Sequence, residues 1–226
     1  MEPSRIILSW SGGKDSALAL HALMQDPTVE VTGLLTTVTS EYDRISIHGV
    51  RRSLLRAQAE RLGLPLFETW IRAGSSNAAY ETAFLESLAD FRRARPEVTH
   101  IAFGDLFLAD VRAYRERLLA ATDWTPVFPI WGEETGALAH RFVAEGFAAR
   151  LVCVDTTQLD AGFAGREFDA QLLSDLPPSV DPCGERGEFH TFVSDGPLFG
   201  SPIPYVCGEK VLRDERFMYC DLLDRT

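Results

Sequence analysis

The feature that most constrains the fold is an alternation of strand-like and helix-like segments along the first 155 residues. Short apolar runs, several of them rich in β-branched residues, occur at 5–10, 30–38, 64–71, 99–104, 126–131 and 149–154. Between them lie segments with apolar residues at helical spacing, at 14–24, 50–62, 77–94, 111–121 and 135–145. This alternation predicts an α/β fold, with a parallel, doubly wound sheet covered by helices on both faces.

The regular alternation of strand-like and helix-like segments ends after Asp155. One more helix is predicted for 167–176, followed by the turn-forming pairs Pro177-Pro178 and Asp181-Pro182. Short strands are predicted for 189–193 and within 203–223. These features predict a small C-terminal α+β annex that folds onto the sheet. We therefore expect one domain over residues 1–157 and the annex over 158–226.

Composition limits the partners and the compartment. The 226 residues include 22 basic and 33 acidic side chains, a net charge of -11, so nucleic acid is not an expected partner. No apolar run reaches the roughly 18 residues of a membrane span, and the N-terminus lacks a secretion signal. The cysteines form no CxxC pair and occur singly, at Cys153, Cys183, Cys207 and Cys220. We expect a cytoplasmic protein without a membrane partner.

A glycine-rich loop joins the first predicted strand to the first predicted helix. In an open parallel sheet, ligands bind at the carboxyl ends of strands, near the point where the strand order reverses. Glycines let the backbone approach a ligand, and the helix N-terminus attracts anions. The loop therefore predicts a site for a phosphate chain, made by Ser11, Gly12, Gly13, Lys14, Asp15 and Ser16. The alternative is a plain tight turn in which Asp15 caps the helix. The loop is not a Walker A motif, because GxxxxGK[ST] is absent.

The string SGGKDS resembles the signature of the PP-loop ATP pyrophosphatases, the adenine nucleotide alpha hydrolase-like group with a HUP/Rossmann-like fold. The resemblance implies that ATP and Mg²⁺ are bound and that ATP is cleaved between its α- and β-phosphates. The loop would hold the pyrophosphate, and a substrate oxygen would become adenylated before a second nucleophile displaces AMP. The loop donors and Lys14 suit this role, since negative charge builds on the departing pyrophosphate.

Three further strings narrow the resemblance. SIHGVRR at 46–52 follows the second strand, Gly104-Asp105 ends the fourth, and GERGEFHTF at 184–192 opens the annex. Together they resemble the diphthine–ammonia ligase family over about residues 4–220. The resemblance implies an ATP-dependent, amide-forming ligase that joins an adenylated carboxylate to ammonia or an amine. Because 20 Arg against two Lys favours a GC-rich bacterial source, where diphthine is absent, the acceptor carboxylate stays open.

Several residues outside the loop are candidates for the same site. We expect His48 and Gly104 in the nucleotide pocket, and Asp15 and Asp105 near Mg²⁺. Two plain alternatives are that His48 packs or caps at the start of a helix and that Asp105 is a helix N-cap.

The candidate catalytic residues are Lys14, Asp105, Glu188 and His190. If 189–193 is a strand, Glu188 and His190 point to the same face and could bind the acceptor or take a proton from ammonia. The alternative is an exposed polar face on a hairpin of the annex.

Two other functions remain open from the sequence. A tRNA-modifying PP-loop enzyme would need an RNA-binding surface, which the acidic charge disfavours, and the Cys pair often used for thiolation is missing. A non-catalytic adenine-nucleotide-binding module could use the same loop, but it would not need Lys14, Asp15 and Ser16 intact. A homodimer is compatible with the sequence.

Overall fold

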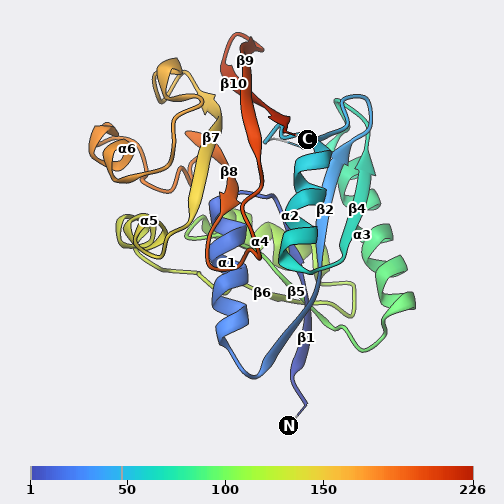
Figure 1. Ribbon diagram of the computed structural model, residues 1–226. Helices are drawn as coiled ribbons and strands as arrows, with labels where there is room; N and C mark the ends of the chain where they lie inside the picture. The colour runs from blue at the N-terminus through green and yellow to red at the C-terminus, as the bar shows by residue number, and fades with distance from the viewer. Residues whose placement is uncertain (1, 47, 226) are drawn as a thin grey trace.

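The computed structural model describes residues 2–46 and 48–225, and within these residues the strands form a six-stranded sheet and a four-stranded sheet (Figure 1). The larger sheet contains β1 (Ser4–Ser9), β2 (Val29–Thr39), β3 (Arg44–Ile45), β4 (Leu66–Ile71), β5 (His100–Ala102) and β6 (Thr125–Val127). β3 runs antiparallel to β2, and the other pairings in this sheet are parallel.

The order of the parallel strands confirms the predicted doubly wound sheet. β2 pairs with β1 on one side and with β4 on the other, and β1 pairs with β5, which pairs with β6. The parallel strands therefore lie in the order β4-β2-β1-β5-β6. The chain moves outward from β1 to β4 and then returns to the other side of β1. The order reverses between β1 and β5, and this is where such sheets bind ligands.

Helices cover both faces of this sheet. Neighbouring residues of a strand point to opposite faces, so each strand supplies apolar side chains to both layers of helices. One face packs against α1 (Lys14–Gln25) and α2 (Arg52–Leu62), through a cluster that includes Ile6, Leu8, Leu20 and Leu54. The other face packs against α3 (Asn77–Ala94) and α4 (Ala109–Leu119), through Ile7, Ile101, Phe84 and Leu119. These apolar runs are buried on both sides, as is usual for parallel strands.

The second sheet holds strands from the C-terminal third of the chain, in the order β8-β7-β10-β9. They are β7 (Ala148–Asp155), β8 (Phe189–Asp195), β9 (Tyr205–Arg213) and β10 (Phe217–Asp224), all paired antiparallel. The prediction that 149–154 continues the parallel sheet is therefore wrong. Apolar periodicity identifies a strand but does not specify its partner. The boundary after residue 157 puts β7 in the first domain, whereas its pairing puts it with the annex strands, and the boundary itself stays a prediction.

Short elements complete the fold. α5 (Thr135–Ala144) precedes β7, and the 3₁₀ helix η1 (Ala161–Phe163) and α6 (Ala170–Asp175) follow it. The predicted helix over 167–176 is shorter than expected, and the strand predicted for 126–131 ends at Val127. Within the described residues, no helix is both long and apolar enough to cross a membrane.

The two sheets share one hydrophobic core. The cluster that packs α1 and α2 onto the larger sheet continues through α5 and α6 into the second sheet, with Phe142, Phe168, Phe189, Phe192 and Leu222. Figure 1 shows β7 and β8 beside the first turns of α1, and the β9–β10 hairpin beside α2. The annex is therefore packed against the carboxyl edge of the parallel sheet, where the site was predicted.

Candidate active site

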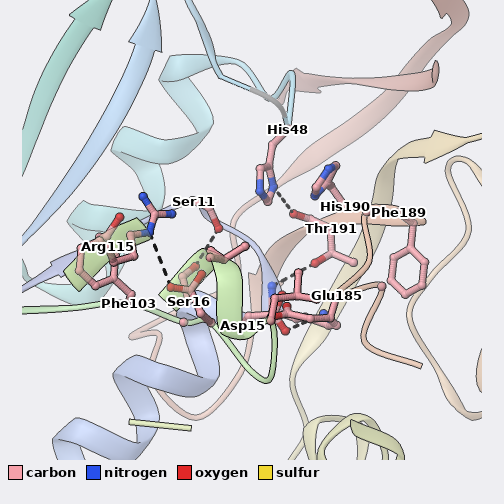
Figure 2. Close-up of a pocket in the computed structure, with 18 residues that line it drawn as sticks. Ser11, Asp15, Ser16, His48, Phe103, Arg115, Glu185, Phe189, His190 and Thr191 are labelled. Carbon is pink, nitrogen blue, oxygen red and sulfur yellow. Dashed lines mark hydrogen bonds and ion pairs between the residues drawn. The ribbon is translucent and has the colours of Figure 1, made fainter. Parts of the chain in front are cut away.

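A cavity of about 390 Å³ lies where the carboxyl ends of β1 and β5 meet the start of β8 (Figure 2). Its walls come from the loop after β1, from residues 103–105, from α4 and from the segment 184–191. Six of the predicted nucleotide-binding residues line it: Ser11, Lys14, Asp15, Ser16, His48 and Gly104. Gly12 and Gly13 shape the same loop from behind.

The loop is held partly by its own hydrogen bonds. The Ser11 hydroxyl accepts from the Gly13 N–H at 3.3 Å, and the Ser16 hydroxyl donates to the Gly13 carbonyl at 2.8 Å. Gly13 is the N-cap of α1 and has no side chain to occupy the N–H groups of the first turn. Thr191 accepts the Lys14 N–H, and the N–H groups of Asp15 and Ser16, together with the helix dipole, favour an anion at the cavity end of α1. The alternative in which Asp15 caps the helix is wrong, because Asp15 lies inside the first turn.

A buried glutamine, Gln58 of α2, ties the loop to β8. Its amide donates to the Gly12 carbonyl at 2.9 Å and to the Val193 carbonyl at 2.6 Å, and its oxygen accepts from the Trp10 indole at 2.9 Å. The Gly12 carbonyl also accepts the Val193 N–H. Gly12 has a φ of 78°, and a Cβ there would lie 2.7 Å from the Gln58 oxygen, so glycine is required. Sequence reasoning missed Gln58, although a lone amide on an apolar helix stripe was a signal.

Lys14 is a buried cation at the base of the cavity. Its side chain is 2% exposed, and its Nζ lies 2.6 Å from Oδ1 of Asp15. Burial alone would lower the pKa of Lys14, but the charge and hydrogen bond of Asp15, with nearby Glu185, raise it above its usual value. The amine is therefore protonated. The Lys14 N–H donates to the Thr191 hydroxyl at 3.0 Å, a second link between the loop and β8.

The end of β5 lies directly against the first turn of α1. A Cβ on Gly104 would be 2.9 Å from the Asp15 carbonyl and 3.0 Å from the Ser16 nitrogen, so a side chain there would displace the loop backbone. Asp105 follows and faces the cavity, near Arg115 of α4. The alternative that Asp105 caps a helix is wrong, because Leu108 is the N-cap of α4.

Two imidazoles lie together at the other end of the cavity. The rings of His48 and His190 are 4.6 Å apart between centroids. His48 Nδ1 lies 3.3 Å from the Thr191 carbonyl, which can only accept, so this nitrogen carries the proton. Burial lowers the pKa of His48 to about 4, and burial together with His48 lowers the pKa of His190 well below its usual value. Both rings are therefore neutral near pH 7. The alternatives that His48 caps a helix and that His190 lies on an exposed face are wrong.

The predicted pairing of Glu188 with His190 is also wrong. Glu188 is 1% exposed and lies outside the cavity lining. Its two carboxylate oxygens accept the N–H groups of Asp181 and Arg186, each at 2.9 Å. The carboxylate thus closes the turn before β8, and it satisfies the buried Asp181 N–H, which would otherwise lack a partner. This position gives Glu188 a structural place in the fold.

Glu185, three residues earlier, lines the cavity instead. Its Oε1 accepts the Leu106 N–H at 2.8 Å, which anchors the segment to the end of β5. Burial raises the pKa of Glu185 to about 7, and the nearby charge of Asp15 adds to the effect, although the Leu106 hydrogen bond opposes it. A carboxyl group with this pKa can exchange a proton near neutral pH. Figure 2 shows Glu185 beside the loop, on the same side as His190.

The fold and the site define a class of α/β proteins that have a glycine-rich loop at the reversal point of a doubly wound sheet, where it lines a cavity with a buried lysine. Residues 4–120 match the diphthamide synthase N-terminal domain, and residues 134–222 match the diphthamide synthase C-terminal domain. The chain belongs to the diphthamide synthase family.

Several curated relatives are similar to this chain over most of its length. The diphthine–ammonia ligase of Danio rerio is 25% identical over 230 residues, which cover 93% of this chain and 90% of that protein. The diphthine–ammonia ligase of Rattus norvegicus is 24% identical over 227 residues, which cover 92% of this chain and 85% of that protein. The Schizosaccharomyces pombe ligase is 26% identical over 205 residues, but this chain spans only 34% of its length.

One solved structure, Candida glabrata FMN adenylyltransferase in complex with FAD and inorganic pyrophosphate, aligns with 62% of this chain and 48% of its own. The TM-score of 0.40 and the 16% identity are too low to establish a shared fold.

Proposed function

We propose that this protein is an ATP-dependent ligase that forms an amide and releases AMP and pyrophosphate. The observation that carries the proposal is the glycine-rich loop with its buried Lys14, placed at the reversal point of the sheet and facing a cavity that β8 closes. Membership of the diphthamide synthase family supports the proposal, as do relatives named diphthine–ammonia ligase. The nucleotide is ATP, and the acceptor is a carboxylate whose identity the following experiment addresses.

In the first half-reaction, the loop holds the β- and γ-phosphates of ATP. A carboxylate oxygen of the acceptor attacks the α-phosphorus, and the bond to the pyrophosphate oxygen breaks. Negative charge builds on the departing pyrophosphate, beside the N–H groups of the first turn of α1 and the Lys14 ammonium. These groups are fixed before the reaction, so they stabilise the charge without rearranging. Pyrophosphate and an acyl-adenylate result.

The carboxylates of the cavity fit a magnesium ion that arrives with the nucleotide. The described residues contain no group of three or more His, Cys, Asp and Glu placed to hold a metal alone. Mg²⁺ commonly takes one or two carboxylates together with substrate phosphates, and Asp15 and Asp105 both line the cavity. Asp15 and Asp105 would hold the ion, which when bound would neutralise phosphate charge.

In the second half-reaction, ammonia or an amine attacks the acyl carbon. The carbon–nitrogen bond forms, the bond to the AMP oxygen breaks, and one proton leaves the nitrogen. Glu185 can accept that proton in its ionised form, which its pKa of about 7 makes available at neutral pH. The neutral rings of His48 and His190 can hydrogen-bond the acceptor without placing a positive charge beside the amine.

A product analysis tests the proposed function. Purified protein would be incubated with ATP, Mg²⁺, ammonium and fractions of a cell metabolite extract, and AMP and ADP would be separated by chromatography. We expect AMP and pyrophosphate only when an acceptor is present, and fractionation then identifies it. ADP and phosphate as products would contradict the proposal.

The same preparation separates the other two functions. ATP binding without turnover in any fraction would favour a non-catalytic nucleotide-binding module. Retention of bulk tRNA in a filter-binding assay would favour a tRNA-modifying enzyme. Light scattering would show whether the protein forms a homodimer, with which the sequence is compatible.

A further inference from the structure

The cavity contains a second cation, Arg115 of α4, whose surroundings are unusual. Its guanidinium lies over the ring of Phe103 at 4.8 Å, and its side chain is 21% exposed. The Nε of Arg115 and the Oδ2 of Asp105 are 3.6 Å apart, which is too far for a hydrogen bond. Both atoms are buried, and among the described residues neither has a hydrogen-bond partner.

Buried polar atoms without partners are rare, because each one has lost its hydrogen bonds to water. Lys14, the other cation of the cavity, is already hydrogen-bonded to Asp15. Arg115 is attracted by Asp105 but lacks that hydrogen bond, so it retains donor capacity toward the cavity. A guanidinium presents a planar set of donors that matches the oxygens of a phosphate or a carboxylate. The local geometry therefore calls for an anionic group of a ligand at this point.

The position of Arg115 in the cavity indicates which anionic group of the ligand it contacts. Figure 2 shows Arg115 and Phe103 on one side of the loop, with Glu185 and His190 on the other. Phe103 is buried beneath the Arg115 guanidinium. Beside it, Leu108 at the N-cap of α4 and Val111 within α4 form an apolar part of the wall that suits a nucleobase. A nucleotide with its last two phosphates on the loop and its base on this wall would extend past Arg115, which lines the same cavity.

We infer that Arg115 binds the α-phosphate of the nucleotide and the phosphate of the acyl-adenylate that follows. The inference rests on the proposed function and adds to it the residue that touches the reacting phosphorus group. Arg115 offsets charge on the phosphoryl oxygens while the carboxylate approaches, and it holds AMP after pyrophosphate has left. The loop and Lys14 then bind pyrophosphate, and Arg115 binds the nucleoside monophosphate.

The experiment compares three ligands by calorimetry: adenosine, AMP and pyrophosphate. In the wild type, AMP should bind more tightly than adenosine because of its phosphate. Arg115→Ala should weaken AMP binding by about 10- to 100-fold, the range expected for hydrogen bonds to a charged group. The variant should then bind AMP about as weakly as adenosine, with the affinities for adenosine and pyrophosphate unchanged. Arg115→Lys, which keeps the charge but loses the planar donors, should recover part of the lost affinity.

Arg112→Ala is the matched control, since Arg112 lies one turn earlier on α4, pairs with Glu116 and lies outside the cavity lining. It should leave all three affinities unchanged. Lys14→Ala should show the opposite pattern, with weaker pyrophosphate binding and AMP binding nearly intact. Thermal melts check folding, and if the Ala variant does not fold, Arg115→Lys and Arg115→Gln carry the same comparison.

The outcomes separate the inference from the proposed function. Unchanged AMP affinity in folded Arg115 variants, in a protein that cleaves ATP to AMP, would overturn the inference alone. An equal loss of AMP and pyrophosphate affinity would also overturn it. If the wild type binds neither ATP nor AMP, the proposed function fails, and the inference fails with it.

Discussion

Two segments face each other across the cavity, and they are built in different ways. The loop at 11–16 offers one cation and the backbone N–H groups that remain after Gly13 donates to Ser11 and Lys14 donates to Thr191. Its hydroxyls are hydrogen-bonded within the loop. The segment at 181–191 offers side chains, and two of them are chemically identical. Glu185 faces the cavity, whereas Glu188 accepts two backbone N–H groups behind it. A carboxylate is available for chemistry only where the surrounding backbone has not already engaged both of its oxygens.

The largest expected effect comes from removing the cation of the loop. Lys14→Ala should lower kcat/KM for ATP by at least about 100-fold, because it removes a fixed charge from the position where charge develops. The affinity for ATP should fall far more than the affinity for AMP. Steady-state kinetics and calorimetry measure both quantities. Equal losses for ATP and AMP would place the β,γ-phosphates elsewhere.

The next effect separates the two carboxylates of the opposite segment. Glu188→Gln turns one acceptor into an amide that faces an N–H group, so about 2 kcal/mol of unfolding free energy should be lost. Urea denaturation measures this loss. Glu185→Gln keeps an oxygen for the Leu106 N–H, so its stability should stay close to that of the wild type while turnover falls. The reverse pattern would exchange the assigned roles of the two residues.

A third effect concerns the pH dependence of turnover. The pKa of Glu185 is raised to about 7, so below that pH the group is protonated and cannot act as a base. The rate should therefore rise as pH increases through about 7, by about tenfold per unit on the acid side, and then level off. The concentration of free ammonia must be held constant across the series. If the rate of Glu185→Gln rises with pH in the same way, the titrating group is not Glu185.

The smallest effect concerns the direct contact between the two segments. Thr191→Val removes the hydroxyl that accepts the Lys14 N–H and keeps the shape of the side chain. The expected loss is about 1 kcal/mol of unfolding free energy, with at most a severalfold change in ATP affinity. Thermal melts and calorimetry measure the two quantities. A loss of ATP affinity as large as that in Lys14→Ala would show that β8, and not the loop alone, orients the phosphate donors.

Much of the fold was predictable because its signals are local. Apolar periodicity identified the strands of the parallel sheet and the helices that cover it. The segment predicted as helical at 50–62 ends where α2 ends, before Gly63, which adopts a left-handed conformation with a φ of 67°. The partner of β7 was not predictable in this way. Its paired residues lie 35 to 47 positions further along the chain in β8 and 62 to 66 positions further in β10. Strand periodicity carries no information about pairing.

The residues of the site also divide into those that local sequence signals predicted and those that they did not. The loop residues and Gly104 were predicted because they follow parallel strands and therefore meet at the carboxyl edge of the sheet. His48 reaches the same edge because it follows the short antiparallel β3, which pairs with the end of β2. Glu188 was misplaced because its orientation depends on the turn that it closes, not on the strand that follows it. Gln58 was missed because its partners come from two distant parts of the chain, Trp10 and Gly12 after β1 and Val193 in β8.

The junction between the loop and β8 uses mostly main-chain atoms: the Gly12 carbonyl, the Lys14 N–H, and both the N–H and the carbonyl of Val193. Main-chain groups are the same whatever side chains a strand carries. A side chain that faces the cavity, such as His190, can therefore be exchanged without removing the main-chain contacts between the loop and β8. A fold with this property can retain one activation step while single substitutions change which acceptor it binds. A new acceptor specificity then does not require a new activation site.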